Sequence, residues 1–222
     1  MRKLLQGILD FRQRVRPTAK NTFAELAFGQ RPDALLVVCS DSRVAVNVFA
    51  STQPGDMFVV RNVGNIIPTP HPDGTSSGDL AEIAALEFGV KQLEVSSIIV
   101  CGHSECGAIG AVMSGAAAGV SPHLHEWVQH AKEALDPGKF VFHAQKPFAP
   151  QNIVSQRNVL VQLEHLRQYP FVAERIAEGK LKLYGWWFDI AEAEVYNWDE
   201  DAKSFVVLDE VRANRMLAEL HE

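Results

Sequence analysis

The sequences VCSDSR at residues 38–43 and CGHSECG at residues 101–107 organise the rest of this chain. Each follows a short aliphatic run, Ala34–Val38 in one case and Val95–Val100 in the other. Short, β-branched runs bounded by Pro or Gly are typical of buried parallel strands. In an open α/β sheet, functional residues lie beyond the carboxyl ends of such strands. We therefore expect two neighbouring strands that bring both polar stretches to one edge of a sheet.

These stretches contain three potential metal ligands, Cys39, His103 and Cys106. Two Cys and one His leave one position open, which is the ligand set of a catalytic zinc, whereas a structural zinc normally has four N or S ligands. His103 and Cys106 are three residues apart, so one turn at a helix start is expected to aim both at one metal. Cys39 would supply the remote third ligand. The sequence therefore predicts one catalytic Zn²⁺ per chain.

Both stretches resemble the two signatures of the β-class carbonic anhydrases. The resemblance extends through Pro54–Asp56, Phe58–Asn65 and Tyr184–Asp189, and it covers about positions 20–210. It implies a zinc lyase, a carbonate dehydratase, that reversibly hydrates carbon dioxide to bicarbonate and a proton. In that family the zinc-bound hydroxide attacks carbon dioxide, and bicarbonate then exchanges for water.

Length and residue patterns favour a single α/β domain over residues 1–222. With 47% hydrophobic residues, a chain of 222 residues can bury one substantial core but hardly two. The alternation of strand and helix patterns predicts a mostly parallel central sheet flanked by helices. Further strands are expected at about 57–60, 181–188, 194–198 and 205–208, and helices at about 79–88, 106–113, 152–168 and near the C-terminus.

Charge and cysteine content exclude several kinds of partner. The formal charge of −6 argues against a nucleic-acid surface, which needs clustered positive charge. No apolar run approaches the length of a membrane span. The three cysteines fit a reducing compartment better than a disulfide framework, because the metal site accounts for two of them. We expect a cytoplasmic protein whose partners are carbon dioxide and bicarbonate.

The first 28 residues or so are predicted to form a helical arm. Thr18–Phe28 is expected as a second helix, with Phe23, Leu26 and Ala27 inward. The many basic residues among the first twenty could indicate a transit peptide, but such peptides are Ser-rich and the first Ser is Ser40. An N-terminal helix of this kind packs across a partner subunit in the resembled family, which implies a homodimer or homotetramer. The apolar residues that recur at helical spacing in the first helix are Leu4, Leu5, Ile8, Leu9 and Val15.

The resemblance implies catalytic roles for Asp41 and Arg43. In the family, the Asp either binds zinc as a blocking fourth ligand or pairs with the Arg and accepts a hydrogen bond from the zinc-bound hydroxide. The second arrangement is physically sensible, because a fixed guanidinium keeps a carboxylate ionised and aimed. The alternative is that Asp41 and Arg43 only brace the turn after the first strand.

The resemblance also implies a small apolar pocket for carbon dioxide. Phe58 and Phe88 are expected from across a dimer interface, and Gly107 contributes its backbone amide. Core packing is the alternative for the apolar members, and an ordinary loop position is the alternative for the Gln. The implied substrate-binding residues are Gln30, Phe58, Val63, Phe88 and Gly107.

Some members of the family carry a regulatory bicarbonate pocket built from a Trp, an Arg and a Tyr. The matching residues here are Leu36, Arg61 and Phe188, so only the Arg is present. We therefore expect Asp41 to pair with Arg43 and bicarbonate not to inhibit cooperatively.

Other groups with metal or redox chemistry are expected to be structural. Cys101 is interpreted as a small core residue. His125-Glu126 resembles the start of a zinc-protease helix, but the second His follows five residues after the first instead of four. The histidines at 123, 125 and 130 are therefore expected at the surface or a subunit contact. The role of residues 136–150 is left open.

The sequence alone leaves two other functions open. A narrower pocket could favour carbon disulfide as the substrate. Alternatively, the zinc could be structural or sensory in a binding module, which requires a fourth strong ligand; only Asp41 or Cys101 is available.

Overall fold

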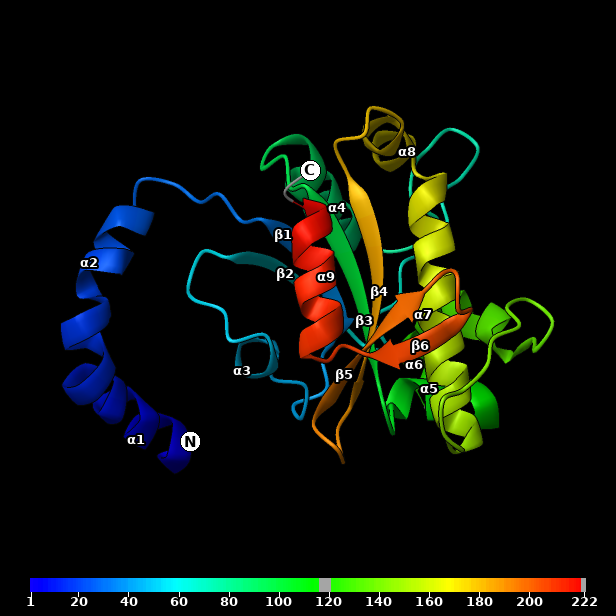
Figure 1. Cartoon of the computed structure of the whole chain (residues 1–222), viewed down its shortest axis with the longest axis horizontal. Helices are drawn as coiled ribbons and strands as arrows, with labels where there is room; N and C mark the ends of the chain where they lie inside the picture. Colours follow the sequence, from blue (N-terminus) through cyan, green and yellow to red (C-terminus); the bar gives the residue numbers. More distant parts are fainter. Residues whose placement is uncertain (116–120, 221–222) are drawn as a thin grey trace.

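A mixed sheet with the strand order β2-β1-β3-β4-β5-β6 forms the centre of the structure (Figure 1). The structure is a computed structural model that describes residues 1–115 and 121–220. β1 pairs in parallel with β2 and β3, and β3 pairs in parallel with β4, whereas β5 and β6 add antiparallel pairs. The predicted mostly parallel α/β fold is confirmed. The strands are β1 (Ala34–Cys39), β2 (Met57–Asn62), β3 (Ser97–His103), β4 (Lys182–Asp189), β5 (Glu194–Asp199) and β6 (Ser204–Val207).

The register of β1 and β3 explains why the two polar stretches meet. Val38 of β1 lies opposite Cys101 of β3. Both strands run in the same direction, so their carboxyl ends reach one edge of the sheet. Cys39 ends β1 and His103 ends β3, which places both side chains at that edge.

Alternating side chains of β1 bury both faces of the sheet. Leu35 and Val37 join the larger core cluster, while Leu36 and Val38 join a second cluster with Phe188. All four are fully buried. A strand buried on both faces has no polar alternation, which is why this segment is a continuous aliphatic run. The helices that follow the strands are α3 (Val46–Phe49), α4 (Leu80–Lys91), α5 (Gly107–Ser114), α6 (Pro122–Val128), α7 (Pro150–Gln168), α8 (Pro170–Ala177) and α9 (Glu210–Leu220), with a 3₁₀ segment at Gln129–Leu135.

Helix α7 packs closely against β3. A Cβ atom at Gly102 would lie 2.7 Å from Val159 Cγ2, so only glycine permits this approach. Most of α7 is buried, including polar residues such as Ser155, Asn158 and Gln162. Because α7 lies so near the end of β3, its polar side chains can reach the backbone that follows the strand.

The N-terminal arm extends away from the sheet (Figure 1). Two helices were expected here, but α1 (Arg2–Asp10) continues through a π-helical segment at Phe11–Val15 into α2 (Arg16–Leu26). Pro17 lies in the first turn of α2, where a missing N–H costs little. None of these elements has a buried residue, so Phe23 is not covered as expected, although Leu26 approaches Gly55.

Residues 136–150, whose role the sequence left open, fold back onto the chain's own core. Phe140, Phe142 and Phe148 pack against the larger core cluster. Lys146 pairs with Asp189 at the end of β4, at 3.1 Å. None of the described helices combines the length and apolar character that a membrane span requires.

Candidate metal centre

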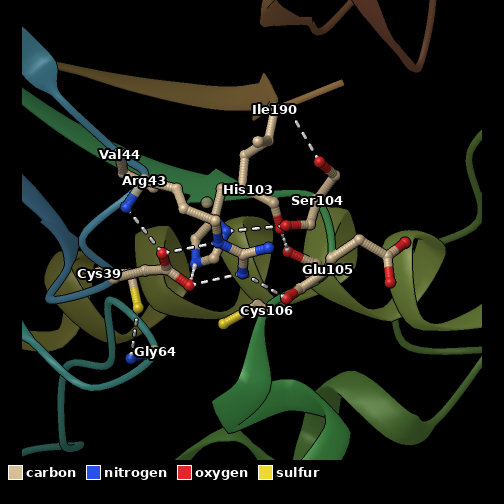
Figure 2. A network of polar contacts seen from close by, with 12 residues as sticks. Cys39, Arg43, Val44, Gly64, His103, Ser104, Glu105, Cys106 and Ile190 are labelled. Carbon is tan, nitrogen blue, oxygen red and sulfur yellow. Dashed lines mark hydrogen bonds and ion pairs between the residues drawn. The ribbon is translucent and has the colours of Figure 1, made fainter. Parts of the chain in front are cut away.

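Cys39, His103 and Cys106 bring their ligand atoms together at the carboxyl edge of the sheet (Figure 2). One sulfur or nitrogen atom from each lies within 4.8 Å of the others, and all three residues are buried. Among the described residues, this is the group of His, Cys, Asp or Glu side chains that could hold a metal ion. The structure therefore brings together the three residues that the sequence nominated.

The local geometry between His103 and Cys106 differs from the expected helical turn. His103 is the last residue of β3, and Cys106 is the N-cap residue of α5. The backbone N–H of Ser104 still bonds the carbonyl of Phe188 at 2.9 Å, which continues the pairing with β4. Glu105 then adopts a left-handed conformation, with φ of 54°. This turn, rather than one turn of helix, aims His103 and Cys106 at the same point.

The His103 ring is prepared to bind through Nε2. Nδ1 lies 2.8 Å from the carbonyl oxygen of Ser104, and since a carbonyl only accepts, Nδ1 carries the proton. Nε2 is buried and has no hydrogen-bond partner. An unpartnered buried lone pair beside two thiols fits a metal cation. Two sulfur donors and one nitrogen donor suit zinc.

The hydrogen bond between the two thiol groups shifts their pKa values in opposite directions. The pKa of Cys39 is lowered, chiefly because its thiolate accepts a hydrogen bond from the Cys106 side chain, and also because it accepts one from the backbone N–H of Gly64. The Gly64 nitrogen is 3.3 Å from Cys39 Sγ. The pKa of Cys106 is raised, because its thiol donates to Cys39 and is buried. A dication bound between the sulfurs would displace the remaining proton.

Asp41 and Arg43 form a fork-like ion pair beside the ligands. Arg43 Nε and Nη2 lie 3.0 and 2.7 Å from the two carboxylate oxygens of Asp41, and the Arg43 backbone N–H adds a third bond at 2.9 Å. These bonds hold the pKa of Asp41 well below its usual range. Asp41 Oδ2 is only 4.0 Å from His103 Nε2. The carboxylate is therefore ionised and next to the cluster.

Three side chains of α7 bind the backbone around the ligands, and sequence reasoning missed all three. Ser155 Oγ donates to the His103 carbonyl at 2.7 Å, and Gln151 Nε2 donates to the Cys106 carbonyl at 2.8 Å. Asn152 binds Glu105 at two points. The sequence does show several polar residues in the first turns of a long predicted helix. It gives no indication, however, of which backbone groups these side chains bind.

The expected substrate residues fall into two groups. Val63 lines an open pocket of about 490 Å³, and its carbonyl accepts a bond from Trp127 Nε1 at 2.7 Å. Gly107 directly follows Cys106, and no atom lies within 4 Å of where its Cβ would be. Phe58 instead pairs in register with Leu35, near the amino end of β1, and packs on Phe88.

Gln30 also lies away from the ligands. It lines a surface pocket at the base of the arm with Pro54, Gly55 and Asp56, beside the amino end of β2. Within one chain, therefore, Val63 and Gly107 lie near the ligand cluster, whereas Gln30, Phe58 and Phe88 lie near the other edge of the sheet.

The positions matched to the regulatory pocket are used for packing. Leu36 is fully buried. Arg61 donates to the carbonyls of Cys39 and Val44 at 2.9 and 2.8 Å, and so braces the segment that carries Asp41. Phe188 stacks on Phe49, with the ring centroids 4.7 Å apart.

Cys101 is a core residue, as expected, whereas the three histidines differ in their exposure. Cys101 is fully buried, and burial raises its pKa to about 12. It is not part of the ligand cluster. His123 is exposed, while His125 and His130 are half-buried on the same short helical region.

Comparisons with known proteins agree with this geometry. A family model described as "Carbonic anhydrase" matches residues 34–195. A carbonic anhydrase of Pseudomonas aeruginosa is 38% identical over 212 residues, covering 95% of this chain and 93% of the relative. The structure of the β-carbonic anhydrase CcaA superposes with a TM-score of 0.83 at 33% identity, covering 93% of this chain and 98% of that one. A tetrameric β-carbonic anhydrase of Sordaria macrospora superposes with a TM-score of 0.73 at 28% identity, covering 88% and 95%.

Proposed function

The chain belongs to the β-carbonic anhydrase family, and we propose that it catalyses the zinc-dependent, reversible hydration of carbon dioxide to bicarbonate and a proton. The observation that carries this proposal is the convergence of Cys39, His103 and Cys106 directly beside the Asp41–Arg43 pair. Three ligands with a neighbouring ionised carboxylate suit a catalytic site better than a closed structural one.

In this proposal Cys39, His103 and Cys106 hold one Zn²⁺ per chain. When bound, zinc supplies a Lewis acid that lowers the pKa of a coordinated water, so that the water can react near neutral pH. The protein fixes the three donors through its own contacts. The Ser104 carbonyl holds the His103 tautomer, and the Gly64 N–H donates to Cys39 Sγ. Such outer contacts orient ligands and adjust their basicity.

Asp41 and Arg43 orient the nucleophile in this proposal. The Asp41 carboxylate accepts a hydrogen bond from the attacking oxygen, and a lone pair of that oxygen then points at the carbon of the substrate. Arg43 holds both carboxylate oxygens, which keeps Asp41 ionised and restricts its direction. The low pKa of Asp41 supports this role, because the ionised carboxylate offers both of its oxygens as hydrogen-bond acceptors.

The substrate pocket requires two subunits in this proposal. Val63 and the Gly107 amide come from the chain that holds the metal, whereas Gln30, Phe58 and Phe88 come from a second copy. Their separation within one chain supports this division. Phe88 is also 44% exposed, so its ring is accessible to a second subunit.

We further propose a homodimer or homotetramer joined through the N-terminal arm. The arm leaves large apolar side chains 40–69% exposed, and these are Leu4, Leu5, Ile8, Leu9, Phe11, Val15 and Phe23. Contiguous exposed apolar surface of this kind marks an interface. With the arm at about residues 1–28, the whole chain of 222 residues would act as one domain of such an assembly. Three free cysteines support a reducing, cytoplasmic location.

The absence of cooperative bicarbonate inhibition also stays a proposal. Its support is that Leu36 and Phe188 are apolar and buried, while Arg61 is bound to backbone carbonyls. Initial rates measured against rising bicarbonate would then follow a simple hyperbolic dependence.

Stopped-flow hydration of carbon dioxide, on protein of known zinc content between about pH 7 and 9, tests the function. We expect turnover that rises with pH and is proportional to bound zinc. Absence of turnover with one zinc bound per chain would contradict the proposal. Carbon disulfide hydrolysis would then be assayed, and absence of that activity too would point to a zinc-binding module without catalysis.

A further inference from the structure

The Asp41 carboxylate lies between the Arg43 guanidinium and the nitrogen atom through which His103 would hold a metal. Its Oδ2 is 2.7 Å from Arg43 Nη2 and 4.0 Å from His103 Nε2. A cation bound to Nε2 would therefore be within reach of a small rotation of the carboxylate. Since a fourth anionic ligand would fill the open position, the direction of Asp41 decides whether that position stays available.

Arg43 can restrict the direction of Asp41 only while its own guanidinium is fixed in place. The Arg43 side chain is 48% exposed, so water competes for its charge. Arg43 has one further anchor, since its Nη2 donates to the carbonyl oxygen of Glu105 at 3.0 Å (Figure 2). That carbonyl fixes the guanidinium, and so fixes the carboxylate it holds.

The Glu105 carbonyl points at Arg43 only while Glu105 keeps its left-handed backbone. Its φ of 54° is unfavourable for a residue with a side chain. Asn152 of α7 opposes relaxation of this turn at two points. Its Oδ1 accepts from the Glu105 backbone N–H at 2.8 Å, and its Nδ2 donates to Glu105 Oε1 at 3.1 Å. Asn152 is 8% exposed, so its amide is held in place.

We propose that Asn152 is a positioning residue that keeps Asp41 paired with Arg43 and off the metal. It acts through a continuous chain of contacts, from Asn152 to the Glu105 backbone, then to Arg43 and finally to Asp41. Asn152 touches neither substrate nor metal. The inference rests on the proposed function only in taking zinc as the bound ion, and it deepens that proposal by explaining how the open position is kept open.

Zinc release to a chelator tests this without any need for turnover. Four proteins form a cycle: the wild-type chain, Asn152→Ala, Asp41→Asn and the double variant. In the wild-type background Asp41 is not a ligand, so Asp41→Asn is expected to leave the release rate unchanged. In the Asn152→Ala background Asp41 has become a ligand, so Asp41→Asn is expected to accelerate release on the order of tenfold.

A purely structural role for Asn152 predicts the opposite pattern. A loosened ligand loop would release zinc faster in Asn152→Ala than in the wild-type chain, and Asp41→Asn would add nothing. That result would overturn the proposal. Asn152→Asp combined with Glu105→Gln serves as the conservative variant, because Asp keeps an oxygen that accepts from the residue 105 N–H and Gln avoids placing two carboxylates together. It is expected to restore the wild-type pattern of the cycle.

Arg43→Ala breaks the same chain of contacts at Arg43, whose side chain is half exposed. This variant therefore tests the proposal even if Asn152→Ala fails to fold. It should show the same acceleration when Asp41→Asn is added. If neither background shows it, Asp41 does not compete for the metal and the proposal is wrong. Lack of carbon dioxide hydration by the wild-type protein would contradict the proposed function, but the zinc-release cycle would still decide the role of Asn152.

Discussion

Gly102 of β3 lies against Val159 of α7 so closely that a Cβ at residue 102 would be 2.7 Å from Val159 Cγ2. The same Cβ would be 3.3 Å from the Ser155 carbonyl, which is backbone and cannot turn aside. This close approach brings the first turns of α7 to the segment that follows β3. Those turns supply the side chains that bind the backbones of His103, Glu105 and Cys106.

Gly102→Ala is therefore expected to lower the free energy of unfolding by about 1–3 kcal/mol, because an added methyl group overpacks a closed interface. Urea unfolding followed by circular dichroism would measure this. Gly110→Ala is the matched control, since a Cβ there meets only Gln151 at an ordinary 3.4 Å and alanine favours helix. Equal stability of the two variants would contradict the packing argument.

Arg43→Lys is expected to lower kcat/KM about 10- to 100-fold. A lysine ammonium cannot reproduce the two parallel bonds to Asp41 and the third bond to the Glu105 carbonyl. The free energy of unfolding should change little, because the side chain is half exposed. Stopped-flow hydration with parallel urea unfolding makes this measurement. Full activity in the lysine variant would show that the fork-like pairing is unimportant.

Cys106→Ser is expected to abolish stoichiometric zinc binding and with it the stabilisation by metal. For the wild-type chain, free zinc at about 1,000 times its Kd adds about 4 kcal/mol to the free energy of unfolding. Calorimetry with and without a chelator would measure this difference. Cys101→Ala is the control, because Cys101 is also buried but lies outside the ligand cluster. Loss of zinc from Cys101→Ala would make Cys101 a ligand.

Glu82 is expected to make the protein less stable as the pH rises. Burial, with help from the charge of Asp79, raises the pKa of Glu82 to about 8. Between the unfolded pKa, about 4.3, and the folded value, the folded state keeps a proton that the unfolded state has lost. Stability therefore falls across this window by at most about 1.4 kcal/mol per pH unit, as the contribution of this single group.

Glu82→Gln should remove that slope while preserving an oxygen to accept the bond from Asn62. Urea unfolding at several pH values between about 5 and 8 would compare the two proteins. Glu87→Gln is the control, because Glu87 lies on the same helix and its side chain is 46% exposed. An unchanged slope in Glu82→Gln would mean that Glu82 is ionised in the folded protein.

The proposal that subunits associate through the N-terminal arm is tested by placing charges on the apolar side of the arm. Leu5→Asp with Ile8→Asp is expected to reduce the mass measured by light scattering after size exclusion, because the charges would be buried in the subunit contact. Lys3→Asp with Gln6→Asp adds two acidic residues on the opposite side of the helix, by its 3.6-residue period, and should leave the mass unchanged. A wild-type chain that is already monomeric would refute the proposed two-subunit pocket.

Much of the sheet could be predicted from sequence, because its strands are buried on both faces. Runs such as Ala34–Val38 are short, wholly aliphatic and bounded by Pro or Gly, which is typical of buried parallel strands. The π-helical segment that joins α1 to α2 was not predictable. Pro is common in the first turn of a helix, so Pro17 indicated the start of a separate helix and not a continuation of α1.

The sequence by itself determined which residues could hold a metal, because Cys39, His103 and Cys106 carry donor atoms and lie at or just after the ends of strands that meet at one edge. It also indicated that Asp41 and Arg43 lie beside this site, because both follow Cys39 within four residues. Only the tertiary structure decided what holds them. Asn152 lies 47 residues from Glu105, and the pairing depends on how closely α7 approaches β3. Such contacts depend on packing between distant segments, which no local pattern encodes.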